Sequence, residues 1–344
     1  MKLLVITQTV DKKDKTLGFF HGWISELAKK SEKIIVVCLY EGEHNLPENV
    51  FVYSLGKEFG SSKVKYLTRF FGLVWKYRKD YDEVFVHMNQ EYILLGAPIW
   101  KLLGKKIFFW RNHPQGSLLT SVAVMLSTKV FCTSTSSFTA RFKKTVVMPA
   151  GIDTHLFHPI PGVVRTKHSV CMVGRISPIK HIFEGLQAVR YLVEKGEQTL
   201  LSIVGNAGEK IEDRKYMDML KLYVSKNNLH SYVKFEEAVL PENLPKIYSS
   251  YDICLNLTDI GSFDKTIVEA AACGAVPIVS NRSLLSLLPD GCVTDRNIDD
   301  IVSAIQKMSQ PQNRLKVQEK LAEFVERQSL DTLMKKLGKE MNLN

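Results

Sequence analysis

The sequence predicts an α/β protein built from two doubly wound parallel sheets, and three observations support this. Short, almost wholly apolar runs alternate with amphipathic stretches along the chain, as expected for strands that helices cover on both faces. A segment rich in proline and glycine, residues 149–164, interrupts the alternation near its midpoint and indicates a domain boundary. A length of 344 residues also favours two domains over one.

The elements follow from the local patterns. In the first half, apolar runs predict strands at residues 3–7, 34–40, 50–55, 83–88, 106–110, 129–134 and 145–150. Residues 21–31 and 62–80 between them have the composition of helices. In the second half, strands are predicted at residues 170–174, 198–205, 233–239, 251–257 and 275–281. Between the last two, a short helix begins at Lys265 and is ended by Gly274.

Composition limits the class of protein. The longest apolar run falls short of the roughly 18–20 residues of a membrane span, and the N-terminal run is short enough to be a first strand instead of a signal peptide. Six cysteines have no metal-like spacing and are expected to be reduced thiols in the core: Cys38, Cys132, Cys171, Cys254, Cys273 and Cys292. We therefore expect a cytoplasmic protein.

The net charge of +10 is confined to one half of the chain. Residues 1–150 hold 22 lysines and arginines against 12 acidic residues, whereas residues 151–344 hold 24 of each. The first half is therefore expected to meet an anionic partner.

The loop after the strand at 170–174 carries two candidate anion ligands. Gly174 ends the strand, Arg175 follows it, and Lys180 is placed by the sequence in the first turn of the next helix. A cation at the partly positive N-terminus of a helix is unfavourable, unless an anion binds the free N–H groups there. Arg175 and Lys180 could then hold a phosphate from two sides, although two solvated surface cations are the simpler interpretation.

Lys265 repeats the same anomaly at the start of the next short helix. One turn later, Glu269 lies among apolar residues that should face the core. It can serve as an i,i+4 partner of Lys265, or it can accept hydrogen bonds from the two hydroxyls of a ribose, as carboxylates do in dinucleotide sites. Cations for a diphosphate and a carboxylate for a ribose together predict a nucleoside-diphosphate site.

Three further loops carry weaker signals. Gly205 and Gly208 follow a strand, where a ligand could approach the backbone, but a plain turn is an equal alternative. His113 follows the strand at 106–110 and is a candidate ligand-facing residue, although a lone histidine is more often structural. Gly18 and Gly22 flank the start of the first helix, either beside a ligand or as an ordinary helix start.

No Asp-x-Asp pair or cluster of histidines and carboxylates offers a set of metal ligands in the sequence. Cations and helix N-termini would have to neutralise the leaving diphosphate in place of Mg²⁺. We therefore expect no metal and no other cofactor. No Gly-x-Gly-x-x-Gly motif follows a strand, which argues against a dinucleotide oxidoreductase.

At this point the sequence resembles a known family. The ordered segments "VGRISPIK", "SIVGNAG", "GSFDKTIVEAAACGAVPIVS" and "MPAGIDTHLFHP" resemble the retaining nucleotide-sugar glycosyltransferases of family four, which have the GT-B fold. The resemblance implies two Rossmann-like domains facing a central cleft. It places an acceptor-side domain at residues 1–155, a donor-binding domain at 156–328, and a C-terminal helix at 329–344 that packs back on the first domain.

The resemblance also implies roles for individual residues. Arg175 and Lys180 would hold the diphosphate of a UDP- or GDP-type sugar, Glu269 the ribose, and His113 would face the donor sugar. Donor contacts would further come from Gly18, Gly174, Gly205, Ala238, Val239, Ser262, Phe263, Asp264, Lys265 and Thr266. The expected reaction is metal-independent transfer to a hydroxyl of a glycan or lipid-linked acceptor, by front-face attack with the donor phosphate assisting deprotonation.

One position departs from the family pattern. The first of the family's two glutamates, eight residues apart, is Gly261 here. This leaves the identity of the donor sugar open, and Asp264 is a candidate for the missing hydroxyl contact. Two alternatives therefore stay open: a non-catalytic nucleotide-sugar binder or partner subunit, and a GT-B epimerase, which would need acid and base residues that the sequence does not provide.

Residues 63–79 predict a basic helix. They contain six basic residues and no acidic one, and at helical spacing Leu67, Phe70, Phe71, Val74 and Tyr77 can share a face. An ordinary core-packing helix with a solvated basic side is the simpler alternative. The other is a helix that lies on an anionic inner membrane surface, which would make the protein peripheral there. No nucleic-acid partner is expected, because no motif for one accompanies the charge.

Overall fold

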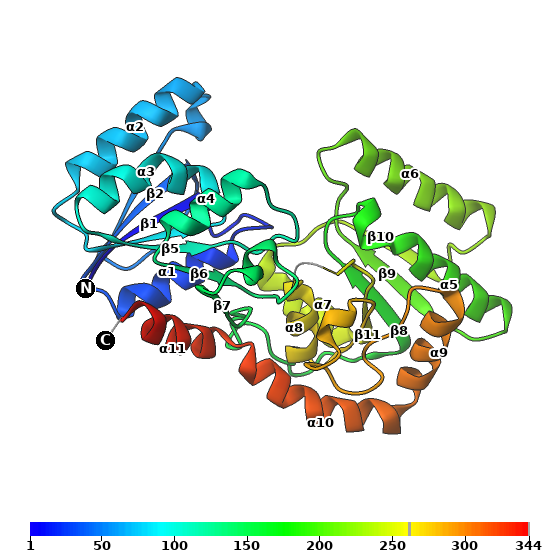
Figure 1. Cartoon of the computed structure of the whole chain (residues 1–344). Coiled ribbons are helices and arrows are strands. Elements are labelled where there is room, and N and C mark those ends of the chain that lie inside the picture. Colours follow the sequence, from blue (N-terminus) through cyan, green and yellow to red (C-terminus); the bar gives the residue numbers. More distant parts are fainter. Residues whose placement is uncertain (261–262, 343–344) are drawn as a thin grey trace. The chain divides into compact units, whose positions relative to one another are not determined.

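The computed structural model describes residues 1–260 and 263–342 (Figure 1), which form two compact units. The first unit contains residues 1–151, Phe263 and residues 330–342, and the second contains residues 152–260 and 264–329. These divisions lie close to residues 155 and 328, the boundaries expected from the sequence.

Within the described residues, the first unit contains a seven-stranded parallel sheet in the order β3-β2-β1-β4-β5-β6-β7. The strands are β1 (Lys2–Val10), β2 (Lys33–Glu41), β3 (Val50–Ser54), β4 (Glu83–His87), β5 (Lys106–Trp110), β6 (Lys129–Cys132) and β7 (Thr145–Val147). The helices are α1 (Phe19–Lys29), α2 (Lys63–Lys76), α3 (Gln90–Leu102), α4 (Leu118–Leu126) and α11 (Leu330–Met341).

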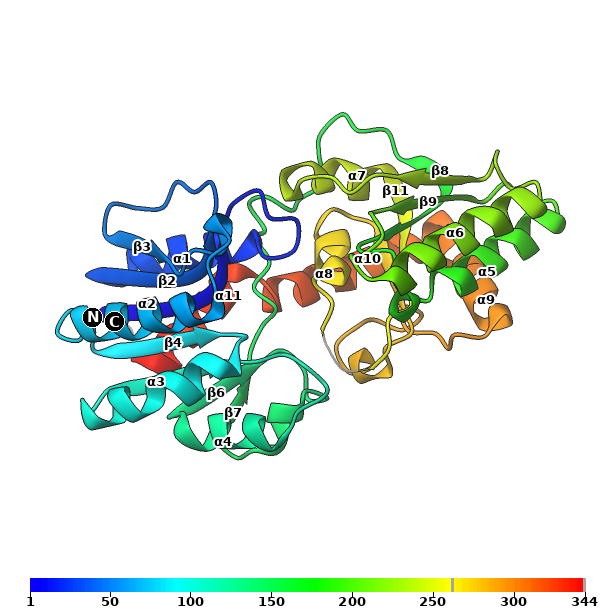
Figure 2. The ribbon, with the colours of Figure 1, turned by 90° about the horizontal axis from the view of Figure 1, so that it is seen from above.

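Both faces of this sheet are buried, as the apolar strands predict. Leu3 and Val5 of β1 belong to a core with residues of α1 and α11, whereas Leu4 and Ile6 belong to a second core with residues of α2, α3 and α4. Because side chains alternate along a strand, one continuous apolar run fills both cores. Figures 1 and 2 show the helices on the two sides of the sheet.

The C-terminal helix α11 packs on the first unit. Its leucines and methionines join the core beside α1, and Lys129 Nζ lies 2.8 Å from Glu340 Oε2. Nearby, Trp23 Nε1 donates a 3.1 Å hydrogen bond to the carbonyl of Gly151. The end of the chain therefore completes the core that its beginning starts.

In the second unit, the described residues form a five-stranded parallel sheet in the order β10-β9-β8-β11-β12. The strands are β8 (Thr166–Val173), β9 (Leu200–Val204), β10 (Val233–Glu236), β11 (Tyr251–Asn256) and β12 (Val276–Val279). The helices are α5 (Ile182–Glu194), α6 (Ile211–Lys226), α7 (Leu244–Ser250), α8 (Lys265–Ala272), α9 (Ile298–Ser309) and α10 (Pro311–Arg327).

The two-sheet α/β prediction is confirmed, and every predicted strand is present with small changes at its ends. Helix α8 begins at Lys265 as predicted. Gly274 follows it with φ +84°, a left-handed conformation that favours glycine after a helix. The six cysteines are buried free thiols, also as predicted. In the described part of the chain, no helix is both long and apolar enough to cross a bilayer.

The apolar residues predicted to share a face of α2 are divided between the core and solvent. Phe70 and Val74 are buried in the core of the first unit, and Tyr77 packs against it. Leu67 and Phe71 instead point to solvent, with exposed fractions of 40% and 37%. The apolar side of α2 is therefore wider than the part buried in the core, and the rest of it is exposed.

Candidate functional site

Two glycines bring the carboxyl ends of β8 and β9 into contact. Gly174 has φ +135° and Gly205 has φ +156°. A Cβ atom on Gly205 would lie 1.9 Å from the carbonyl oxygen of Gly174, so no side chain fits at this position. The close approach of the two loops is by itself a sufficient reason for the glycine.

Arg175 and Lys180 lie together at the carboxyl ends of β8 and β11. Both line a small hollow, with Gly174 on one side and Asn256 and Thr258 on the other. Its volume is about 10 Å³, close to the room that one water molecule needs. This edge of the sheet is where doubly wound folds bind their ligands, so the structure brings these two predicted residues to a suitable place.

Lys180 does not lie in the first turn of an α-helix, and that prediction was wrong. Residues Pro178–Lys180 form a 3₁₀ turn (η3), in which the N–H of Lys180 donates to the carbonyl of Ser177 at 3.0 Å. His181 follows with φ +50° and separates the turn from α5. The dipole of α5 begins after Lys180, so this lysine is not an unfavourable helix-start cation.

Asp264 connects Lys180 to the start of α8. The ammonium of Lys180 contacts Asp264 Oδ2, which also accepts a 2.9 Å hydrogen bond from Asn256 Nδ2. Oδ1 accepts the N–H of Thr266 at 3.4 Å, as the N-cap of α8. Burial acts to raise the pKa of Asp264, but the charge of Lys180 and these hydrogen bonds hold it below the usual value. The carboxylate already has partners, which leaves little capacity for a sugar hydroxyl.

Glu269 and Lys265 form a half-buried electrostatic pair on α8, in which the Nζ atom of Lys265 is shielded from solvent. Burial raises the pKa of Glu269, which the charge of Lys265 partly offsets. Burial likewise lowers the pKa of Lys265, and Glu269 opposes this shift. Tyr248 of α7, which is fully buried, donates to Glu269 Oε2 at 3.3 Å. The i,i+4 role expected as the simpler alternative is therefore present.

This pairing changes the interpretation of the lysine that begins α8. The Nζ atom of Lys265 is buried and interacts with a carboxylate one turn further along the helix. The unusual charge at this helix start is therefore balanced within the protein, and the case for an anion site rests on Arg175, Lys180 and the backbone N–H groups of α8.

The sequence analysis missed Asn256, which links the candidate residues. Its Nδ2 donates to Asp264 Oδ2 and to Thr266 Oγ1, both at 2.9 Å, and its Oδ1 accepts the N–H of Thr258 at 3.2 Å. Asn256 is the last residue of β11. A polar residue that ends an apolar strand is a visible signal, and it could have been found in the sequence.

Two further donor-side predictions, Ala238 and Val239, lie in the loop after β10 of the second unit. The N–H of Ala238 donates to Asn206 Oδ1 at 3.1 Å, which ties the loop after β10 to the loop after β9. Val239 is partly buried and Phe263 is buried. Gly261 and Ser262 lie outside the described residues.

Two of the predicted residues lie in the first unit. His113 is exposed in the loop after β5, and its Nδ1 accepts the N–H of Gln115 at 3.0 Å. Gly18 precedes α1, where a Cβ atom would lie 2.5 Å from the carbonyl oxygen of Asp14. Tight local packing therefore favours glycine at this position.

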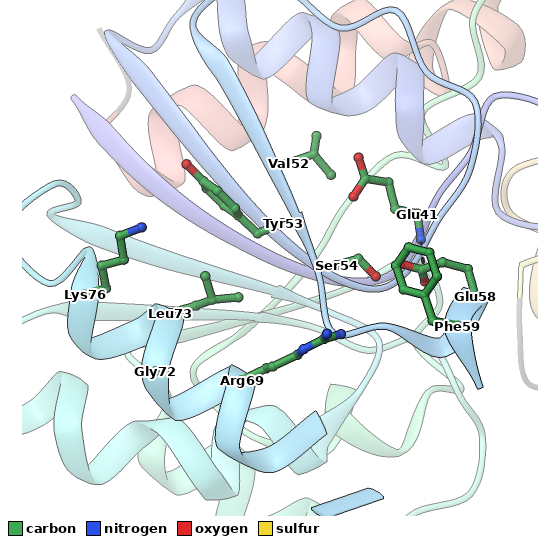
Figure 3. Close-up of a pocket in the computed structure, with 10 residues that line it drawn as sticks. All are labelled: Glu41, Val52, Tyr53, Ser54, Glu58, Phe59, Arg69, Gly72, Leu73 and Lys76. Carbon is green, nitrogen blue, oxygen red and sulfur yellow. Dashed lines mark hydrogen bonds between the residues drawn. The ribbon is translucent and has the colours of Figure 1, made fainter. Parts of the chain in front are cut away.

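A much larger pocket, of about 900 Å³, lies elsewhere in the first unit. Figure 3 shows it between α2 and the strands β2 and β3. Its lining is Glu41, Val52, Tyr53, Ser54, Glu58, Phe59, Arg69, Gly72, Leu73 and Lys76. None of the predicted donor residues lines this pocket. The larger pocket and the predicted diphosphate ligands therefore lie in different parts of the molecule. We give more weight to the strand ends of the second unit, because several ligand-competent groups converge there.

Metal ligands do not gather anywhere in residues 1–260 and 263–342: no three histidine, cysteine or carboxylate side chains are placed to share an ion.

The family comparison matches the part of the chain that forms the second unit. The profile of the family described as glycosyl transferases group 1 matches residues 155–328, which include all the second-unit residues discussed above. No curated protein sequence matches the chain.

Several solved structures share the fold over the whole chain. Alr3699/HepE from Anabaena, in complex with UDP and glucose, has a TM-score of 0.78 at 18% identity and covers 99% of both chains. A sucrose-phosphate synthase from Thermosynechococcus elongatus has a TM-score of 0.78 at 15% identity, over 99% of this chain and 98% of that one. A glycosyltransferase from Rickettsia africae has a TM-score of 0.75 at 14% identity, over 100% and 99%.

At these identities the solved structures establish the fold, which is GT-B, and the profile match establishes the family. Since that match spans just over half of the 344 residues, the chain belongs to the glycosyl transferases group 1 family and is a glycosyltransferase.

Proposed function

We propose that the protein is a retaining glycosyltransferase of family four. It moves a sugar from a nucleoside-diphosphate sugar to a hydroxyl of a glycan or lipid-linked acceptor. The observation that carries the proposal is the convergence of Arg175 and Lys180 on one hollow at the carboxyl ends of β8 and β11, within the segment that matches the family.

In this proposal, charge on the protein replaces a metal ion at the leaving group. The guanidinium of Arg175 and the ammonium of Lys180 neutralise the diphosphate as the glycosidic bond breaks. The N–H groups of Lys265 and Thr266 at the start of α8 add partial positive charge. Glu269 binds the ribose, and Tyr248 keeps its carboxylate in place through the 3.3 Å hydrogen bond.

The acceptor is deprotonated with the help of the donor phosphate, on the same face from which the nucleotide leaves. His113 is the candidate contact to the donor sugar, and Gly18 is the candidate approach to the diphosphate. Because the sequence has Gly261 where the family has its first glutamate, specificity for the sugar must come from other residues. UDP-glucose is the donor to test first, since UDP and glucose are bound by the HepE structure of similar fold.

A test of this function needs no knowledge of the acceptor. The protein is incubated with UDP-glucose, UDP-N-acetylglucosamine and GDP-mannose in turn, and slow transfer to water is followed by release of the nucleoside diphosphate. We expect release from one donor, unchanged in excess EDTA. Proton NMR before mutarotation should detect the α-anomer from an α-linked donor. Release of the β-anomer would refute retention, and activity that needs added Mg²⁺ or Mn²⁺ would refute metal independence.

The same assay separates the alternatives. A non-catalytic binder would be stabilised by a donor, by about 2.7 kcal/mol at 100 times the dissociation constant, and would release no product. An epimerase would convert the sugar nucleotide to its epimer.

We further propose that α2 places the protein on an anionic membrane surface, where a lipid-linked acceptor would lie. Four apolar side chains form an exposed stripe along α2, with exposed fractions of 37% to 70%: Val64, Leu67, Phe71 and Trp75. Their spacing of three to four residues puts them on one side of the helix.

The basic residues lie beside this stripe. Lys65 is exposed on α2, and Lys79 is exposed in the turn that follows the helix. The guanidinium of Arg78 stacks over Trp75 at 4.4 Å. An exposed apolar stripe with a cationic flank is the pattern of a helix that lies in the membrane interface. The exposed stripe supports this proposal better than the apolar face expected from the sequence, because Phe70 and Val74 of that face are buried in the core.

A further inference from the structure

Asp264 uses the same groups that a donor phosphate would use. Its Oδ2 atom contacts the ammonium of Lys180, and its Oδ1 atom accepts an N–H at the start of α8. Both side chains are mostly shielded from water, with exposed fractions of 21% for Lys180 and 16% for Asp264. A carboxylate here thus satisfies one cation and one helix N-terminus, both of which favour anions.

We propose that Asp264 is an internal competitor of the donor diphosphate for Lys180 and the N-terminus of α8. This inference rests on the proposed function. When the diphosphate binds, Lys180 must give up or share its contact with Asp264. Binding is then weaker than the site could provide, and release of the nucleoside diphosphate product is correspondingly easier, which suits an enzyme that must turn over.

The position of Asp264 makes the competition strong. A 2.9 Å hydrogen bond from Asn256 holds the carboxylate beside Lys180. The charge of Lys180 and the hydrogen bonds from Asn256 and Thr266 keep the pKa of Asp264 below its usual value. The carboxylate is therefore ionised at neutral pH. Two anions that share one cation in a partly buried site repel each other, an effect that shifts neighbouring acids by one or more pKa units.

The obvious alternative is that Asp264 positions Lys180 for the donor. The two roles predict opposite signs. A positioning residue, when neutralised, weakens diphosphate binding, because Lys180 loses its orientation. A competitor, when neutralised, strengthens it, although the folded protein loses an ion pair and becomes less stable.

The experiment compares Asp264→Asn with wild type for the binding of UDP, GDP and inorganic pyrophosphate by calorimetry, and for thermal unfolding. Asparagine has the shape of aspartate and is an equally good N-cap, so the helix start is preserved. We expect about tenfold tighter binding, the equivalent of one pKa unit, together with a lower unfolding temperature. Asp264→Ser, which keeps an N-cap oxygen without charge, should give the same two signs.

A matched control is Asp259→Asn. Asp259 lies in the loop after β11, and its side chain is 56% exposed and pairs with Arg296 and His181. This change removes the same charge without touching Lys180, so binding should change less than about threefold. A double-mutant cycle with Lys180→Met adds a specific readout. The gain from Asp264→Asn should be smaller when Lys180 is absent, because the contested ammonium is gone and only repulsion and competition for the N-terminus of α8 remain.

Two results would overturn the inference, and they can be told apart. In the first, wild type binds a diphosphate and Asp264→Asn binds it equally well or more weakly. This result refutes the competition and leaves the proposed function intact. If neither wild type nor Asp264→Asn binds any of the three probes, the diphosphate role of the site fails, and the inference fails with it.

Discussion

Helices α8 and α2 both begin with a lysine, and the structure treats the two in opposite ways. Lys265 of α8 has a buried ammonium whose charge is opposed by Glu269. Lys63 of α2 is exposed and belongs to a basic surface beside a solvent-facing apolar stripe. A buried charge must be balanced inside the protein, whereas an exposed one is available to partners. Burial, more than position in a helix, therefore decides which cations take part in binding.

The largest expected effect comes from unbalancing the half-buried pair. Lys265→Met leaves the Glu269 carboxylate without its neighbouring cation, and we expect a loss of about 3 kcal/mol in the free energy of unfolding. Lys63→Met, the same change at the exposed helix start, should alter stability by less than about 0.5 kcal/mol. Urea denaturation of both variants measures the difference. An equal loss in the free energy of unfolding for both variants would show that burial does not explain the difference between the two lysines.

The exposed Arg175 and the mostly shielded Lys180 at the strand ends should matter for activity instead. Arg175→Ala and Lys180→Ala each remove charge at the leaving diphosphate, and we expect turnover to fall at least about 10²-fold, or roughly 2.7 kcal/mol of transition-state stabilisation. For Arg175→Ala, stability should be nearly unchanged. Lys180→Ala should also cost some stability, because Asp264 loses its ionic partner. Wild-type turnover in both variants would remove the basis for a diphosphate site.

The pH dependence of nucleotide binding should report on the half-buried Glu269. Its folded-state pKa is raised by burial, lowered by Lys265, raised by Asp264 and lowered by the hydrogen bond from Tyr248. A ribose hydroxyl donates a stronger hydrogen bond to the ionised form than to the protonated form, so UDP affinity should fall as pH drops through a midpoint above 4.5, the usual value for this side chain. Tyr248→Phe removes one stabilising donor, which should move that midpoint upward and weaken binding severalfold at fixed acidic pH.

A nearby tyrosine provides the control for this change. The hydroxyl of Tyr251 donates to Ser202 Oγ at 2.6 Å and belongs to β11. Tyr251→Phe should leave the midpoint of UDP binding where it is in wild type. A midpoint that is unmoved by Tyr248→Phe would exclude Glu269 as the titrating group.

The smallest effects are expected on the exposed surface of α2. Wild type should sediment with vesicles that contain anionic lipid at low salt and be released at high salt. A single change such as Trp75→Gln or Lys79→Glu should weaken this binding by about 1 kcal/mol, or five- to tenfold. Leu102→Gln, at an apolar side chain of α3 that is 83% exposed, should have no effect. Absence of binding at low salt, or an equal loss in the α3 control, would contradict a specific role for α2.

Much of the architecture could be predicted because it depends on local patterns. Continuous apolar runs such as residues 34–40 are typical of strands in a parallel sheet that is covered on both faces. The order of the strands in each sheet was not predicted. Gly274 ends α8 because the residue after that helix must adopt a left-handed conformation. The candidate residues Arg175, Lys180 and Glu269 were also visible, since each is a charged group at the end of a strand or on an otherwise apolar helix.

The tertiary structure alone decided which partners each charged side chain has and which apolar side chains are buried. Lys180 and Asp264 are 84 positions apart in sequence, so no local pattern predicts their contact or the competition it implies. The burial of Lys265, the hydrogen bond from Tyr248 to Glu269, and the exposure of Phe71 beside the buried Phe70 are likewise set by neighbouring elements. The physical reason is that periodicity states which residues share a side of a helix or strand, whereas solvation and electrostatic balance depend on what packs against that side.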